Sequence, residues 1–245
     1  MTPRPLDRSS AVRPTVLTAA GAAVALLALT LAVLAHLRPL VSVDGAISEA
    51  ALHTALGHPW WRSTMAAVTM TGSTAVLGPI AAAGCLVLLW RRRLRAACFV
   101  AVTLPVTLAI RLLLVNAIHR ARPVDQLAPA AGWSFPSGHT TASAATALIV
   151  VLVCWSLVRR RSIRVVVAGL AGGWAVVVGI SRVALVVHWP SDVLGGWLLV
   201  LAVVPPAALL LRRPFTQRLR RTAPAVLWRG GRTRAGPRSR TRTRR

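Results

Sequence analysis

Residues 181–192 read SRVALVVHWPSD and place an Arg, a His and an Asp at the end of one very apolar segment. His188 and Asp192 are four positions apart, so a helical stretch would bring them to the same side. Pro190 between them favours a break, with a new helix beginning near Ser191. In either geometry Asp192 can hold the imidazole of His188 in one tautomer and stabilise its cation. Such residues at the rim of a membrane segment are costly, which favours a functional role.

Two further motifs accompany this stretch. Residues 120–123 read RARP, and residues 135–140 read FPSGHT. Taken singly, each motif is more often structural, as a stiff turn, a helix cap or a rim histidine. All three lie at segment ends that the topology below places on one side, and this coincidence favours a shared site.

The composition is that of a membrane protein. The chain has 245 residues, of which 55% are hydrophobic and only five are acidic, too apolar for a soluble domain of this length. All 30 basic residues are Arg, and none is Lys. The three cysteines lie in apolar runs without the spacing of a disulfide framework or a zinc site.

Six apolar runs are long enough to cross a bilayer as helices. They are residues 14–35, 72–90, 96–118, 137–158, 165–187 and 191–211. The first run and its basic flank also fit a signal peptide, but its 22 uncharged residues exceed a usual signal core and favour a retained span. Residues 38–63 mix charges with a Trp pair, which is typical of an interfacial helix or loop.

Arginine blocks predict the orientation. They lie in the N-terminal segment, in residues 91–95, in residues 159–164 and in the C-terminal tail. With six spans all four blocks fall on one side, which the positive-inside rule assigns to the cytoplasm. The connections at 38–63, 119–137 and 188–190 then face outward, and all three motifs lie on or next to that face.

We therefore expect an all-α integral membrane bundle of six transmembrane helices in the plasma membrane, with an extracytoplasmic-facing active site and both termini cytoplasmic. Residues 1–13 form the N-terminal segment and residues 14–211 the six-span domain. Residues 212–245 form an Arg-rich, disordered tail that we expect to contact anionic lipid headgroups. Charge alone also permits nucleic-acid binding by the tail, which we do not expect.

The PSGH motif enters the fourth span, where free N–H groups and the positive end of the helix dipole form an anion site. Ser137 can cap this helix, Gly138 lets a ligand approach the backbone, and His139 can reach a bound anion. Arg122 and Arg182 can clamp a phosphoryl group and stabilise charge on its oxygens.

Two histidines beside two arginines suit phosphoryl transfer through a covalent phosphohistidine. One imidazole attacks phosphorus, and the other protonates the leaving alkoxide. No acidic cluster is available to hold a metal, so we expect metal-independent chemistry without a cofactor. The acidic residues expected on the outer side are scattered: Asp44, Glu49, Asp125 and Asp192.

Together, RARP, FPSGHT and SRVALVVHWPSD resemble the three signature motifs of the type-2 phosphatidic acid phosphatases, or lipid phosphate phosphatases. That family shares its site with bacterial acid phosphatases and vanadium haloperoxidases. Its third motif is Ser-Arg, five residues, His, three residues, Asp, and residues 181–192 match it fully; residues 136–139 match the second motif. The resemblance spans about residues 111–196.

By this resemblance His188 is the nucleophile, Asp192 its orienting partner and His139 the general acid. The residues that would hold the phosphate are Arg122, Arg182, Ser137 and Gly138. The family's first motif begins with a Lys seven positions before Arg122, and here that position is Val115.

No Lys exists elsewhere to replace it. Arg111, one helical turn before Val115, can extend toward the site and is the candidate substitute. Asn116 or Arg120 can also contribute. For Arg120 and Arg62 we otherwise expect contacts with lipid headgroups.

The resemblance implies a membrane phosphatase that hydrolyses a lipid phosphate or diphosphate of the prenyl diphosphate, phosphatidic acid or phosphatidylglycerol phosphate type. The alternative is a non-catalytic membrane protein that binds phosphate or lipid with a degenerate first motif. A soluble haloperoxidase-like enzyme conflicts with the six spans.

Overall fold

The computed structural model describes residues 8–212, which form eight α-helices and contain no β-strand. Residues 1–7 and 213–245, with nearly all of the expected tail, lie outside the described residues. The helices are α1 (Arg8–Leu34), α2 (Arg38–Gly57), α3 (Pro59–Thr71), α4 (Thr74–Trp90), α5 (Leu94–Ile118), α6 (Gly138–Leu157), α7 (Arg161–Ala184) and α8 (Pro190–Arg212).

Within the described residues, six helical segments are long and apolar enough to cross a membrane. They are Val12–Leu34, Pro59–Trp90, Leu94–Ile118, Gly138–Leu157, Arg161–Ala184 and Pro190–Leu210. The predicted all-α, six-span architecture is therefore confirmed.

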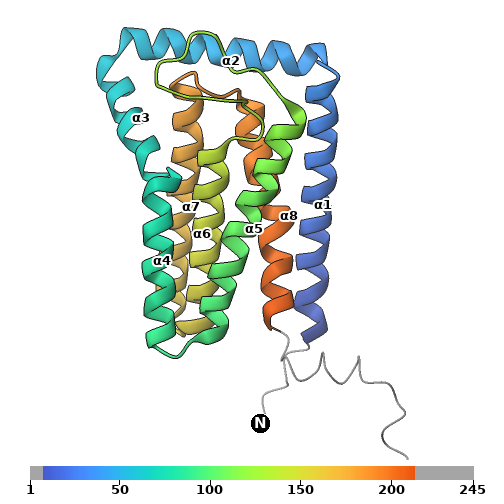
Figure 1. Cartoon of the computed structure of the whole chain (residues 1–245), viewed down its shortest axis with the longest axis vertical. Helices are drawn as coiled ribbons and strands as arrows, with labels where there is room; N and C mark the ends of the chain where they lie inside the picture. The colour runs from blue at the N-terminus through green and yellow to red at the C-terminus, as the bar shows by residue number, and fades with distance from the viewer. Residues whose placement is uncertain (1–7, 213–245) are drawn as a thin grey trace, which may run out of the picture. The chain divides into compact units, whose positions relative to one another are not determined.

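The second span differs from the prediction, because it begins at Pro59 rather than at residue 72. Helix α3 descends from α2 and continues into α4 after a short bend (Figure 1). The bend packs closely on α7: a Cβ at Gly72 would overlap with Cγ1 of Val178. A side chain at this position would clash, so the glycine permits the close approach.

Helix α6 has contacts with α4, α5, α7 and α8, and α1 packs against α8. The buried side chains of α6 are nearly all small, and small residues let neighbouring helices approach closely in a membrane. They are Thr140, Thr141, Ala142, Ser143, Ala145, Ala147 and Ile149.

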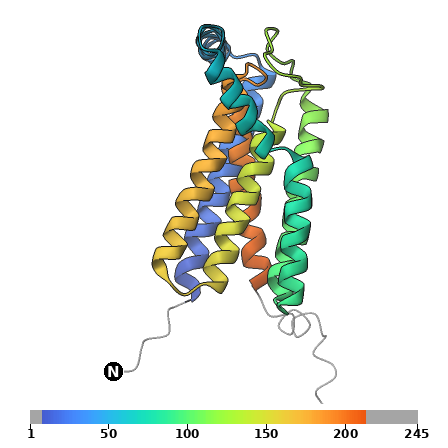
Figure 2. The same cartoon turned by 90° about the vertical axis from the view of Figure 1, so that its left-hand side faces the viewer.

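Helix α2 does not span the bundle but lies across its end, as Figures 1 and 2 show. It contacts α3, α7 and α8, and it leaves Val41, Val43 and Ile47 exposed. This arrangement matches the interfacial helix expected for residues 38–63 as far as residue 57, whereas residues 59–63 belong to α3 and the second span.

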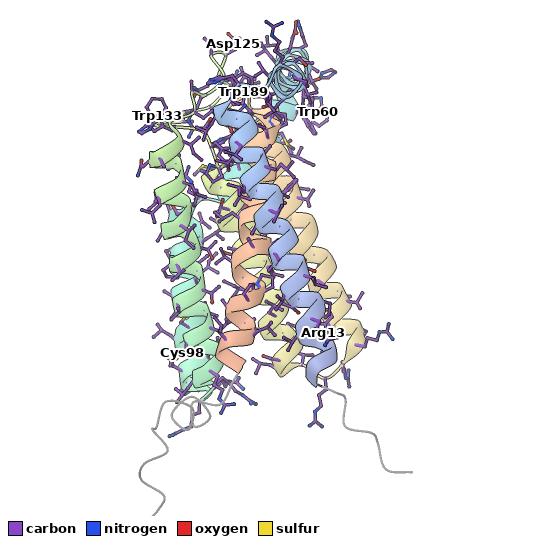
Figure 3. All side chains as sticks on the ribbon, turned by 90° about the vertical axis from the view of Figure 1, so that its right-hand side faces the viewer. Arg13, Trp60, Cys98, Asp125, Trp133 and Trp189 are labelled. Atoms are coloured by element: carbon purple, nitrogen blue, oxygen red, sulfur yellow. The ribbon has the colours of Figure 1, made fainter. Side chains whose placement is uncertain are left out.

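The three motifs gather at this same end, in the long 119–137 connection and the short 185–189 connection (Figure 1). Trp60, Trp133 and Trp189 lie here, whereas Arg13 and Cys98 lie at the opposite end (Figure 3). The α4–α5 and α6–α7 turns, which carry Arg91–93 and Arg159–160, also lie at that opposite end. Which side of the membrane each end faces stays a prediction.

Candidate active site

The 185–189 connection is a tight turn that points His188 inward. The backbone N–H groups of Val187 and His188 both donate to the Arg182 carbonyl, at 3.1 and 3.3 Å. Val186 has a φ of 53°, a left-handed conformation that a β-branched residue adopts only where its surroundings hold it. Helix α8 then begins at Pro190, one residue before the start predicted near Ser191.

Asp192 orients the imidazole of His188. The Nδ1 atom of His188 lies 3.3 Å from Oδ2 of Asp192, and the same oxygen accepts the Trp189 N–H at 3.0 Å. On the other side of the ring, Nη1 of Arg122 donates to Nε2 at 3.0 Å. Both contacts fit the tautomer with its proton on Nδ1, so Nε2 carries the lone pair.

Burial sets the charge of this imidazole. His188 is only 1% exposed, and burial lowers its pKa from 6.5 to about 4 against the opposing effect of Asp192. The positive charges of Arg122 and Arg182 lower this pKa further. At neutral pH the ring is therefore uncharged, as a nitrogen nucleophile must be.

Arg122 joins the 119–137 connection to the 185–189 turn. Its Nε and Nη atoms donate to four backbone carbonyls as well as to His188: Gly132 at 2.9 Å, Val187 at 2.6 Å, Ala131 at 3.1 Å and Trp133 at 3.2 Å. Burial lowers the pKa of this guanidinium, and Asp192 opposes the effect. An anion that binds here has to take over one of these hydrogen bonds.

The start of α6 keeps its N–H groups uncapped by any side chain of the described residues. The expected cap by Ser137 is not formed; instead Thr140 Oγ1 donates to Ser137 Oγ at 3.0 Å, and the Ser137 N–H donates to the Asp192 carbonyl at 3.0 Å. Ser137 therefore ties α6 to α8, and the N-terminal N–H groups of the helix are left for an anion.

Arg111 reaches this helix start from α5. Its Nε donates to the Pro136 carbonyl at 3.0 Å. A Cβ at Gly138 would lie 3.2 Å from Cζ of Arg111, so the guanidinium lies directly against the backbone of the PSGH motif. Asn116, the other candidate on α5, is exposed, and Val115 is buried.

Arg182 is 4% exposed and is held by Nη1, which donates to Thr69 Oγ1 on α3 at 2.6 Å. Its Nε is buried and has no hydrogen-bond partner within residues 8–212. A buried N–H of a guanidinium is costly to leave unpaired, and an anionic ligand would satisfy it. The sequence motifs did not identify Thr69, which is 113 residues away.

His139 lies in the first turn of α6, only partly exposed. The groups whose charges act on its ring are Arg182, His188, Arg111 and Arg122. The structure thus brings together all the predicted site residues: two histidines, three arginines, Asp192 and the start of α6.

The expectation that Arg120 contacts lipid headgroups is wrong. Its Nη1 donates to Asp192 Oδ1 at 2.7 Å and to Ser191 Oγ at 2.6 Å, and its Nη2 donates to Asp44 Oδ2 at 2.7 Å. Asp44, on α2, is 2% exposed. Three helices separate Asp44 from Arg120 in the chain, and two more separate Arg120 from Asp192, so no motif spacing connects these partners. The sequence signal is a single carboxylate in the first turns of α2. Arg62 donates to the Leu127 carbonyl at 3.2 Å.

A cavity of about 550 Å³ lies at the opposite end of the bundle and is lined mainly by Arg92, Arg93, Arg95 and apolar residues. Its lining contains no histidine or carboxylate, so this cavity does not fit phosphoryl transfer to a histidine. A cavity of about 420 Å³ is lined by Arg122, Gln126 and Trp133, beside the candidate site. Within residues 8–212 no group of three or more His, Cys, Asp or Glu side chains could hold a metal ion.

Comparison with known proteins supports the same family. The family model of the PAP2 superfamily matches residues 116–216. Phosphatidylglycerophosphatase B of Bacillus subtilis (strain 168) is 31% identical over 174 residues, which cover 69% of this chain and 83% of that protein. Phosphatidylglycerophosphatase B of Escherichia coli (strain K12) is 38% identical over 82 residues, 34% of this chain and 30% of that protein.

A solved structure agrees with these sequence matches. The crystal structure of the first transmembrane PAP2 type phosphatidylglycerolphosphate phosphatase from Bacillus subtilis superposes with a TM-score of 0.69 at 27% identity. The match covers 81% of this chain and 98% of that one. This six-span membrane protein therefore belongs to the PAP2 superfamily, the family of the type-2 phosphatidic acid phosphatases.

Proposed function

We propose that this membrane lipid phosphatase hydrolyses its substrate through a phosphohistidine on His188, without a metal ion. The observation that supports this most directly is the environment of Nε2. The imidazole is buried and neutral at neutral pH, its proton faces Asp192, and its lone pair faces Arg122.

The phosphate would bind between three guanidinium groups and the start of α6. The unpaired Nε of Arg182, the guanidinium of Arg111 and the first N–H groups of α6 supply donors for its oxygens. Arg122 would shift its Nη1 hydrogen bond from Nε2 of His188 to a phosphate oxygen. That shift frees the nucleophilic lone pair only when substrate is present.

In the first step Nε2 attacks phosphorus and the bond from phosphorus to the lipid oxygen breaks. His139 gives its proton to the leaving alkoxide, and Asp192 stabilises the positive charge that forms on the phosphorylated imidazole. In the second step His139 accepts a proton from water, the hydroxide attacks phosphorus, and the bond from phosphorus to Nε2 breaks. Inorganic phosphate leaves, and His188 is neutral again.

The relatives' names supply the first substrate to test. Because they are phosphatidylglycerophosphatases, we propose phosphatidylglycerol phosphate, with phosphatidic acid and a prenyl diphosphate as further candidates. The apolar helix surfaces would keep the lipid tail in the bilayer while the phosphate reaches the end of the bundle. We place this end on the outer side of the plasma membrane, because the arginine-rich turns lie at the other end.

The test is phosphate release by purified, detergent-solubilised protein in excess EDTA, with the three lipids as substrates. Beside the wild type we would assay His188→Ala and, as a matched control, His53→Ala, which removes an exposed histidine of α2. We expect release that survives EDTA, disappears with His188→Ala and persists in His53→Ala. Loss of release in EDTA that added metal restores would refute the metal-free mechanism. Full activity of His188→Ala would refute the phosphohistidine. No release by folded wild type from any of the lipids would favour the non-catalytic, lipid-binding alternative.

A further inference from the structure

Helix α2 supplies a buried carboxylate to the site, although it carries none of the three motifs. Asp44 is 2% exposed, whereas Glu49, on the same helix, has a side chain that is 75% exposed and lies 3.9 Å from His53. The two acidic residues of α2 therefore have different surroundings, and only Asp44 faces the bundle.

Each oxygen of Asp44 has a partner near the catalytic residues. Oδ1 accepts the backbone N–H of Ser191 at 3.0 Å, and Oδ2 accepts the Ser191 hydroxyl at 2.5 Å and Nη2 of Arg120 at 2.7 Å. Asp44 therefore holds the first turn of α8 directly before Asp192. A carboxylate at a helix N-terminus also interacts favourably with the helix dipole.

Arg120 lies between two carboxylates. Nη1 binds Oδ1 of Asp192 at 2.7 Å, while Oδ2 of Asp192 faces His188. If Arg120 had no acidic partner besides Asp192, its full positive charge would be compensated by Asp192 alone. The attraction between Asp192 and the imidazole of His188 would then be weaker. Because Asp44 also binds this guanidinium, it compensates part of the positive charge of Arg120. The negative charge of Asp192 therefore stabilises the imidazolium that forms during phosphoryl transfer more strongly.

We infer that Asp44 is a positioning residue for the nucleophile. It sets the orientation of Asp192 through the start of α8 and its effective charge through Arg120, and it does not touch the substrate. This inference rests on the proposed function, because it assigns Asp44 to the reaction at His188.

A positioning role and a purely structural role predict different kinetics. A residue that acts only on the transition state lowers kcat and leaves KM nearly unchanged, whereas a misfolded site changes both or lowers the amount of active protein. Two residues that act through one network also have non-additive effects.

The experiment uses the full-length protein in detergent with a short-chain phosphatidic acid, and measures kcat, KM and thermal unfolding. The variants are Asp44→Asn, Arg120→Gln, the double variant, His188→Ala and Glu49→Gln. We expect Asp44→Asn to lower kcat about 10-fold, a typical effect for a residue that supports a catalytic group, with KM within about 2-fold. Glu49→Gln is the matched control, and we expect wild-type kinetics from it.

For the double variant we expect a kcat close to that of either single variant, about 10-fold below wild type, because both act through Asp192. Multiplicative effects, a wild-type kcat of Asp44→Asn, or a higher KM with unchanged kcat would each overturn the inference. If Asp44→Asn does not fold, the double variant removes both charges and decides the question by its own kcat: a wild-type value overturns the inference. Inactive wild type would instead refute the proposed function, whereas active wild type with inactive His188→Ala upholds it whatever Asp44 does.

Discussion

Arg111 is our candidate for the role that Lys has in the first family motif, and this role can be tested directly. Its Nε donates to the Pro136 carbonyl at 3.0 Å, and its Nη atoms have no hydrogen-bond partner within the described residues. The guanidinium lies against Gly138, where the uncapped N–H groups of α6 begin. We predict that Arg111→Ala weakens binding of the phosphate in both the ground state and the transition state.

The size of the effect follows from the contact that is lost. One hydrogen bond between two charged groups contributes about 1.5–3 kcal/mol, which corresponds to roughly 10- to 100-fold in kcat/KM. Arg111→Lys keeps the charge but loses the fork of donors, so we expect an intermediate loss.

The assay is phosphate release over a range of substrate concentrations, with competitive inhibition by inorganic phosphate as a separate measure of binding. Arg62→Ala is the matched control, because Arg62 lies at the same end of the bundle and donates only to the Leu127 carbonyl. We expect its kcat/KM to stay within about 2-fold of wild type.

A kcat/KM of Arg111→Ala within about 2-fold of wild type would refute the proposed role. Equal losses in Arg111→Ala and Arg62→Ala would refute it as well, because the effect would then reflect positive charge at this end in general. Either result would leave the phosphate held by Arg122, Arg182 and the start of α6 alone.

Three further predictions concern the partners of the site. Asp192→Asn should lower kcat by roughly 10³- to 10⁴-fold with little change in KM, because the His188 imidazole can then adopt the wrong tautomer. Steady-state kinetics of the folded variant would measure this loss, and a loss of kcat below about 10-fold would contradict the prediction. Because burial lowers the pKa of His188 to about 4, the unfolded chain binds a proton between pH 6.5 and 4 that the folded chain does not. Stability should therefore fall by about 3 kcal/mol as the pH drops through this window; thermal unfolding should detect the fall in wild type and a smaller one in His188→Gln, and equal falls would contradict the assignment. Thr69→Val removes the hydrogen bond to Arg182 and should lower kcat/KM about 10-fold. The control is Thr64→Val, at an exposed position on the same helix, which should keep the wild-type kcat/KM. Similar kcat/KM values for the two variants would contradict a role for Thr69.

The spans and the motif ends could be predicted from the sequence because their signals are local. Uninterrupted apolar runs specify membrane helices by length alone, and Pro190 marks the start of α8 because proline fits the first turn of a helix. The arginine blocks indicated which connections lie together, and the bundle places the 91–93 and 159–160 turns at one end.

The partners of the candidate catalytic residues could not be predicted from the sequence, because these contacts depend on how the helices pack. Asp44 is 147 residues from Ser191, and Thr69 is 113 residues from Arg182. Asp44 lies on α2, which crosses the end of the bundle and contacts α7 and α8, and Thr69 lies on α3, which packs against α7. The beginning of the second span at Pro59 was missed for the same reason: the polar and aromatic residues of α3 looked interfacial, but the helix packs against α7.

The proposed replacement of the family's Lys by Arg111 has a geometric explanation. Positions 111 and 115 share one face of α5 and lie about 6 Å apart along the axis. Val115 is 5% exposed, so a longer, charged side chain there would have to fit among packed neighbours. Arg111 lies farther from the helix end, and its long side chain extends back toward the PSGH backbone, where Gly138 leaves room for the guanidinium. The positive charge thus reaches the start of α6 from a position with more space, and the absence of Lys from the whole chain is compatible with an intact phosphate site.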